Sequence, residues 1–183
     1  MDIIRLAAQE IEAAKPKSKR NPFVFLGSCD SYTAIGDGSF SEQNLIDGFN
    51  QYAAAVFRLV QNIIPKLEVQ GAQNVLFEGV QLIPSLVKPH LNHRNKFILV
   101  TTDEKKLKSN RDGLFKDNQE LLERYSIERL MLVQTEIMRQ SLMIPNNQLL
   151  IIENLNLYTE TTAAILSFLI DNGTIEDNPN KSS

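Results

Sequence analysis

The sequence has few of the residues that form disulfide bonds or zinc sites. Its single cysteine, Cys29, cannot form an internal disulfide, and its two histidines, His90 and His93, are too few for a Cys/His zinc site. We therefore expect a reduced, cytoplasmic setting. The two histidines have metal-like spacing, but no cysteine or acidic residue stands near them, which favours a surface loop.

Long apolar runs and excess positive charge are also lacking. No apolar run approaches the roughly 18 residues of a membrane span, and Asp2 stands where a signal peptide would carry positive charge. The net charge of -3 argues against binding to nucleic acid or anionic membrane through overall charge. We expect neither partner. The short basic run Lys15–Arg20 is either a solvated linker or a local anion contact.

The composition indicates one folded domain. Apolar residues make up 43% and charged residues 22% of the chain, a balance typical of a globular protein and not of a disordered one. Because single domains commonly span roughly 100 to 200 residues, we expect one α/β domain over residues 1–172. We expect the polar residues 173–183 to form a disordered tail.

One long amphipathic helix is the clearest element. A capping box of Ser39 and Glu42 predicts its start, Pro65 predicts a kinked or frayed last turn, and Gly71 predicts its end. Its apolar stripe has the spacing of a helix buried on one face. The stripe consists of Leu45, Ile46, Phe49, Tyr52, Ala53, Val56, Phe57, Val60, Ile63, Ile64 and Leu67.

Three near-continuous apolar stretches predict β-strands, at Asn74–Phe77, Lys96–Val100 and Gln148–Ile152. Such stretches suit a parallel sheet that helices cover on both faces. Phe23–Leu26 is a further, brief strand candidate. Helical stripes precede and follow the strands, which is the α/β order of elements.

A carboxylate follows the first predicted strand. Ligands of open α/β sheets bind at the carboxyl ends of the strands, which is where Glu78 stands. A carboxylate there can hold Mg²⁺, or water bound to it, beside a nucleotide phosphate. The alternative is an ordinary acid that caps the next turn.

An ordered set of segments resembles the 2-phosphoglycerate kinase family across most of residues 2 to 154. The set consists of Met1–Arg5, Asp30–Ala34, Gly48–Gln51, Phe77–Val80 with Pro84, Lys96–Lys106, and Arg124-Tyr125 with Ile127–Gln134. The resemblance implies a P-loop-kinase-like three-layer α/β fold with a mostly parallel sheet. It also implies ATP- and Mg²⁺-dependent phosphoryl transfer to a small phosphorylated acid such as 2-phosphoglycerate.

The resemblance implies roles for particular residues. Those implied are Glu78, Arg111 and Arg124 in catalysis, with Glu78 also near Mg²⁺; Asp2, Arg5, Asp30, Ser31 and Tyr32 in acceptor binding; and Lys105 and Lys108 in nucleotide binding. Lid arginines can stabilise charge on the transferring oxygens. Two questions stay open. The basic residues of the lid, about residues 103–126, either act on ligand or form a solvated helix face, and residues 30–32 either face the acceptor or cap a turn.

The chain departs from the family pattern at two places. Gln81 stands where the family has histidine, and the G-x-x-x-x-G-K-[ST] loop is absent, because no Gly-Lys pair occurs. That loop cradles the nucleotide phosphates with its backbone N–H groups and its lysine. Gly36–Ser39 is a poor substitute, since Asp37 and Glu42 oppose an anion. We therefore expect the chain alone to be inactive, either as a piece of a full kinase or as a separate binding or regulatory protein.

The absence of the strand that leads into this loop predicts self-association. In kinases of this type the strand lies between those that resemble Asn74–Phe77 and Lys96–Val100, so its absence exposes two apolar edges. Covering them requires Phe23–Leu26, a second copy, or a missing N-terminal segment. We expect concentration-dependent oligomers, detectable by light scattering.

Overall fold

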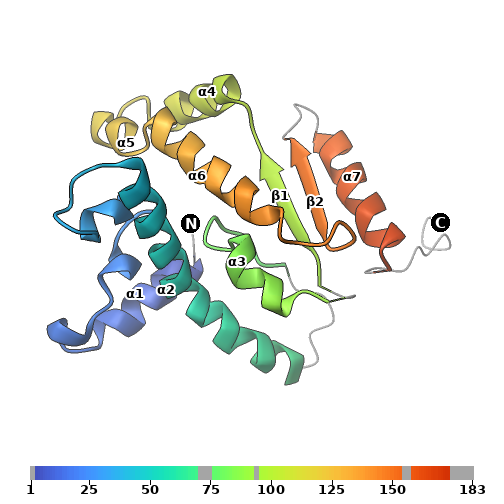
Figure 1. Ribbon diagram of the computed structural model, residues 1–183, viewed down its shortest axis with the longest axis horizontal. Helices are drawn as coiled ribbons and strands as arrows, with labels where there is room; N and C mark the ends of the chain where they lie inside the picture. The colour runs from blue at the N-terminus through green and yellow to red at the C-terminus, as the bar shows by residue number, and fades with distance from the viewer. Residues whose placement is uncertain (1–2, 70–75, 93–94, 154–157, 174–183) are drawn as a thin grey trace.

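The computed structural model describes residues 3–69, 76–92, 95–153 and 158–173 (Figure 1). Its α-helices are α1 (Ile3–Ala13), α2 (Glu42–Val69), α3 (Pro84–Val87), α4 (Glu104–Phe115), α5 (Gln119–Arg124), α6 (Ile127–Ser141) and α7 (Tyr158–Asp171). Its 3-10 helices are η1 (Lys17–Lys19), η2 (Pro22–Phe25), η3 (Ser31–Ala34) and η4 (Lys88–His90), and its strands are β1 (Phe97–Thr101) and β2 (Leu149–Glu153). Residues 174–183 of the predicted tail lie outside the described part.

The strands predicted at Lys96–Val100 and Gln148–Ile152 are confirmed, each one residue later than expected. β1 and β2 pair in parallel, with Phe97 opposite Leu149 and Thr101 opposite Glu153. A parallel pair needs a long crossover connection, and α4, α5 and α6 supply it. The mixed α/β class with a parallel sheet is therefore confirmed, whereas the described residues form a two-stranded sheet and not the three-layer sheet of a P-loop kinase.

The other two strand predictions are wrong for the residues that can be checked. Leu76 and Phe77 belong to no strand, and Leu76 is 86% exposed; Asn74 and Val75 lie outside the described residues. Phe23–Leu26 falls largely in the 3-10 helix η2, because Pro22 begins it and the Asn21 side chain accepts the N–H of Phe23.

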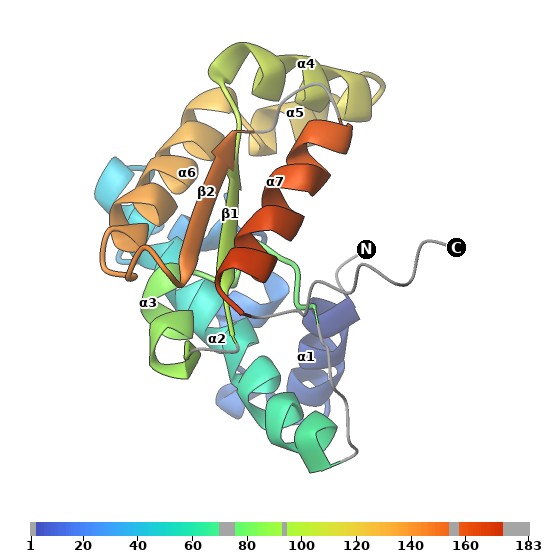
Figure 2. The same cartoon turned by 90° about the vertical axis from the view of Figure 1, so that its right-hand side faces the viewer.

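Each strand is covered on one face only. Successive strand residues point to opposite faces, so Leu99 and its partner Ile151 share one face, and Val100 and Ile152 share the other. Leu99 is buried against α6, but Ile151 is 43% exposed; Ile152 is buried on the side of α7, but Val100 is 49% exposed. Figure 2 shows α6 and α7 on opposite sides of the strand pair. Within the described residues, each face of the strand pair is therefore only partly covered, since Leu149 still packs against the core on the face of Ile151.

The main core forms around α2, as its apolar stripe predicts. Leu45, Phe49, Ala53 and Val56 are fully buried and pack with Leu99 and with α6. The predicted start is wrong by two residues: the Ser41 hydroxyl, not that of Ser39, accepts the N–H of Asn44. The helix runs through Pro65 to Val69, within two residues of the end predicted at Gly71, which lies outside the described residues. Among the described residues, no helix has both the length and the apolar composition of a membrane span.

A buried polar network ties α2 and α3 to the last turns of α6. The amide nitrogen of Gln140 donates to Asn50 at 2.9 Å and to Glu136 at 2.8 Å, while its oxygen accepts the N–H of Ser85 at 3.2 Å. Arg139 makes two hydrogen bonds of 2.7 Å to Glu136. These bonds outweigh the effect of burial and lower the pKa of Glu136, so this carboxylate remains ionised in the core.

Gly48 allows α2 to approach the backbone of η3. A Cβ atom at this position would lie 2.5 Å from the carbonyl carbon of Ser31 and 2.6 Å from the nitrogen of Tyr32. Backbone atoms cannot rotate away as a flexible side chain can. The short distance therefore requires glycine here, although glycine is unfavourable inside a helix.

We expect Gly48→Ala to lower the free energy of unfolding by about 1–3 kcal/mol, the usual cost of overpacking. Gly113→Ala is the matched control, because Gly113 also lies inside a helix, and a methyl group added there would meet no atom within 4 Å. This control should raise stability by about 0.5–1 kcal/mol. Urea unfolding followed by circular dichroism measures both. If Gly48→Ala raised the free energy of unfolding as much as Gly113→Ala does, the close approach of η3 to α2 would be contradicted.

Candidate anion-binding site

The loop before η3 and the end of α5 meet through an ion pair. The Nε of Arg124 lies 2.8 Å from Oδ2 of Asp30, and its Nη2 lies 3.1 Å from Oε1 of Glu120. The side chain of Asp30 is 21% exposed and that of Arg124 is 41% exposed. The structure thus joins a residue expected in acceptor binding to one expected in catalysis, although they are far apart in the sequence.

A second arginine lies beside this pair, between two aromatic rings. The rings of Tyr32 and Phe40 meet edge to face, with centroids 5.5 Å apart and planes at 84°. The guanidinium carbon of Arg129 lies 4.9 Å from each ring centroid. Cation–π attraction to both rings fixes the guanidinium from two sides.

Arg129 and Phe40 are the residues that the sequence did not single out. Arg129 stands in the first turn of α6, whose N-cap is Ser126, and its helical stripe gives no reason to separate it from other surface arginines. Its environment comes from η3 and from the loop before α2, which are distant in sequence. A basic residue near the start of the helix was the only available signal.

Ser31 does not face a ligand. It is fully buried, and its hydroxyl donates to the carbonyl of Ser28 at 3.0 Å. This geometry favours the interpretation in which Ser31 caps a turn. For Tyr32, the half-buried ring leaves a binding role open.

Cys29 is buried directly beneath this loop. Burial raises the pKa of its thiol to about 11, with the charge of Asp30 acting in the same direction. The thiol is therefore neutral at physiological pH and supplies packing, not a nucleophile.

The region predicted to be a lid consists of α4 and α5. The rings of Phe115 and Tyr125 stack between them, with centroids 5.4 Å apart. Arg111 makes hydrogen bonds to Asp112 at 2.9 and 2.5 Å, so its neighbour neutralises its charge. Lys105 and Lys108 are exposed on α4. Within the described part of the chain, neither lysine forms an ion pair, as expected of a solvated helix face.

The base of this lid is fixed to α6. The side-chain amide of Gln134 accepts the N–H of Thr102 at 3.1 Å and donates to its carbonyl at 2.9 Å. Asp103 then caps α4 by accepting the N–H of Lys106. The chain therefore leaves β1 in a fixed direction, which places α4 and α5 over the start of α6 (Figure 1).

Glu78 is not joined to the lid arginines. It is exposed on the segment that enters α3, which contacts the last turns of α6, whereas Arg124 directly precedes the first turn of that helix. A helix of 15 residues is about 22 Å long. No contact between described residues links Glu78 to Arg111 or Arg124, so the expected convergence is not observed.

The exposed Glu78 is not part of a cluster of metal-binding residues. In the described ranges, no group of three or more His, Cys, Asp or Glu residues could together hold a metal ion. Gln81 is fully buried, and its amide finds no hydrogen-bond partner there. Asp2 lies outside the described residues, as does His93, and Arg5 is placed only as part of α1. His90 is exposed, as expected of a surface position.

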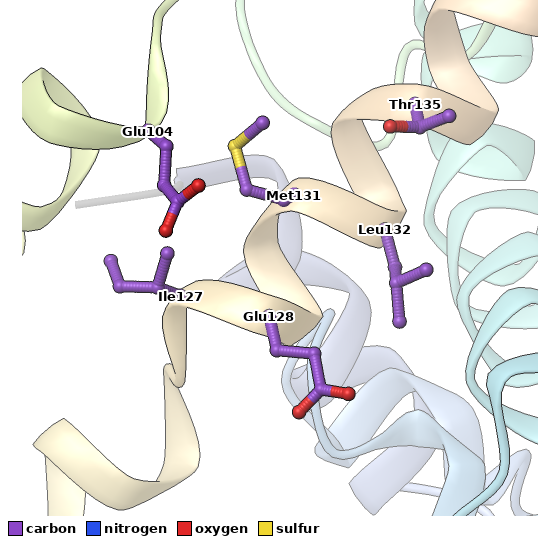
Figure 3. Close-up of a pocket in the computed structure, with 6 residues that line it drawn as sticks. All are labelled: Glu104, Ile127, Glu128, Met131, Leu132 and Thr135. Atoms are coloured by element: carbon purple, nitrogen blue, oxygen red, sulfur yellow. The ribbon is translucent and has the colours of Figure 1, made fainter.

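A cavity of about 330 Å³ lies between α4 and α6 (Figure 3). Ile127, Met131 and Leu132 provide its apolar lining, and Glu104 and Glu128 contribute carboxylates. Two negative charges oppose a phosphorylated ligand. The cavity is therefore not the candidate site, which consists of Asp30, Tyr32, Phe40, Arg124 and Arg129.

Searches against protein-family models, curated proteins and solved structures found no match to this chain. The resemblance to 2-phosphoglycerate kinases thus stays an expectation from the sequence, and the function has to be argued from the site.

We expect Cys29 in the folded chain to react with a thiol reagent at pH 8 at least about 100-fold more slowly than in the unfolded chain. A pKa raised from 9.0 to about 11 reduces the thiolate fraction by roughly that factor, and burial adds to the protection. Absorbance assays with and without guanidinium chloride measure the two rates. Similar rates in both states would contradict a packed loop above Cys29.

Proposed function

We propose that this chain binds a small phosphorylated acid at the candidate site and represents the acceptor-binding part of an ATP-dependent phosphotransferase. The observation that carries the proposal is the contact between Asp30 and Arg124. Residues that the sequence assigned separately to the acceptor and to the lid lie within hydrogen-bond distance, on elements that a packed core holds. Catalytic groups on separate elements need such a common support.

The charges of the site suit an acidic ligand. Two arginines lie at the junction of α5 and α6, and a guanidinium matches the oxygens of a phosphate or carboxylate in a bidentate arrangement. The carboxylates of Asp30 and Glu120 both form ion pairs with the guanidinium of Arg124. A phosphate group would compete with them for this guanidinium, and the carboxylate of Asp30 would accept a proton or a hydrogen bond from the acceptor hydroxyl.

A second candidate function is binding without catalysis, as in a regulatory protein. The absence of a Gly-Lys phosphate loop and the lack of companion ligands around Glu78 among the described residues favour it. Both functions use the same acceptor site. They differ only in whether ATP, Mg²⁺ and a phosphate loop supplied by another segment produce turnover.

We expect the 183-residue chain to bind 2-phosphoglycerate but to form no 2,3-bisphosphoglycerate from ATP and Mg²⁺. Arg124→Gln should weaken binding by about 10-fold or more, since a hydrogen bond to a charged group contributes about 1.5–3 kcal/mol. Isothermal titration calorimetry measures the binding, and chromatography of the products measures turnover.

Arg58→Gln is the control, because Arg58 is exposed on α2 and lies outside the site. No binding of 2-phosphoglycerate to the wild-type chain would refute the proposed function. Turnover by this chain alone would refute the expected inactivity and would require another segment to act as the phosphate loop.

A further inference from the structure

Arg129 differs from the other half-buried arginines of the described residues. Arg20 donates to the carbonyl oxygens of Ala13 and Lys15, at 2.6 and 2.9 Å. Arg111 and Arg124 each make an ion pair with a carboxylate. The only hydrogen bond of Arg129 to a described residue runs from its Nη1 to the carbonyl oxygen of Arg124, at 3.5 Å. Its remaining guanidinium N–H groups have no acceptor in the described part of the chain.

Its charge also lacks a counter-ion among the residues that the structure describes. None of the ion pairs of the described residues includes Arg129. Its neighbour Glu128 lines the cavity between α4 and α6 (Figure 3), and the nearby Asp30 is bound by Arg124. The unused donors of this half-buried guanidinium need an acceptor, which is either water or a ligand. The two aromatic rings attract the charge but accept no conventional hydrogen bond.

The position of Arg129 is nevertheless fixed. Tyr32 belongs to η3, which the close approach at Gly48 holds against α2, and Phe40 directly precedes the N-cap of α2. The rings therefore restrict the guanidinium, whose carbon lies 4.9 Å from each ring centroid. A fixed planar donor set of this kind matches two oxygens of a single oxyanion.

We propose that Arg129 binds one oxyanion of a small ligand, a phosphate or a carboxylate, through these unused N–H groups. Tyr32 and Phe40 position the guanidinium and do not themselves bind the anion. Only the identity of the natural ligand rests on the function proposed above; the oxyanion site itself does not. The sequence assigned anion contacts to Arg111 and Arg124, but carboxylates of this chain already occupy both.

The test titrates the full chain with inorganic phosphate and, separately, with acetate, using calorimetry and the NMR signal of the Arg129 Nε–H group. We expect at least one of the two anions to bind with one-to-one stoichiometry and to shift this signal, and the anion that binds identifies the group recognised. Arg129→Gln should weaken this binding at least about 10-fold. Arg129→Lys keeps the charge but loses the planar fork, so it should weaken binding about fivefold or more.

Arg58→Gln is again the control and should bind as the wild type does. If Arg129→Gln fails to fold, Arg129→Lys decides. The proposal is overturned if neither anion binds the wild-type chain, or if both Arg129 variants bind as tightly as it does. If the Arg129 variants bind 2-phosphoglycerate as tightly as the wild-type chain does, this inference alone is overturned. Phosphate binding through Arg129, without any binding of 2-phosphoglycerate, would refute only the proposed function.

Discussion

The close packing of the η3 backbone against α2 at Gly48 supports the candidate site. The missing side chain lets Ser31 and Tyr32 lie directly on the long helix, and this buries Ser31 and Cys29 beneath the loop. Asp30 and Tyr32, which flank Ser31, are then directed toward α5 and α6. A larger residue at position 48 would displace the whole loop, and with it both residues that contact the arginines. A packing constraint in the core thus determines the geometry of a polar surface site.

Charge at the site is distributed unevenly. Arg111 and Arg124 have carboxylate partners, whereas Arg129 has two aromatic rings and one long hydrogen bond. The carboxylates Glu104 and Glu128 line a separate cavity on the other side of the α6 start. The charges therefore favour an anionic ligand beside Arg129 and disfavour it in the cavity between α4 and α6.

The sheet and the polar network show how the rest of the fold is supported. α6 covers β1 on one face and α7 covers β2 on the other, which leaves Val100 and Ile151 partly exposed. The hydrogen bonds of Gln140 hold α3 to the last turn of α6, and those of Gln134 hold the end of β1 to the middle of this helix. α6 therefore contacts both the partly covered strand pair and the candidate site. Parallel strands are usually buried on both faces, which agrees with the expected self-association without testing it.

The sequence by itself determined the elements whose signal is local. The apolar spacing of α2 and the apolar runs of β1 and β2 predicted their type and place within a few residues, because periodicity and residue type act over short distances. Tertiary structure decided the rest. Leu76 and Phe77 have strand-like composition, yet no described strand pairs with them. Phe23 lies in the 3-10 helix η2 and not in a strand, because Pro22 begins this helix and Asn21 caps it. The sequence marked Asp30, Tyr32 and Arg124 as candidates but gave no means to join them or to find Arg129. The surroundings of Arg129 form because Gly48 lets η3 pack against α2. Local sequence patterns do not predict this contact, because the two segments are separated in the chain.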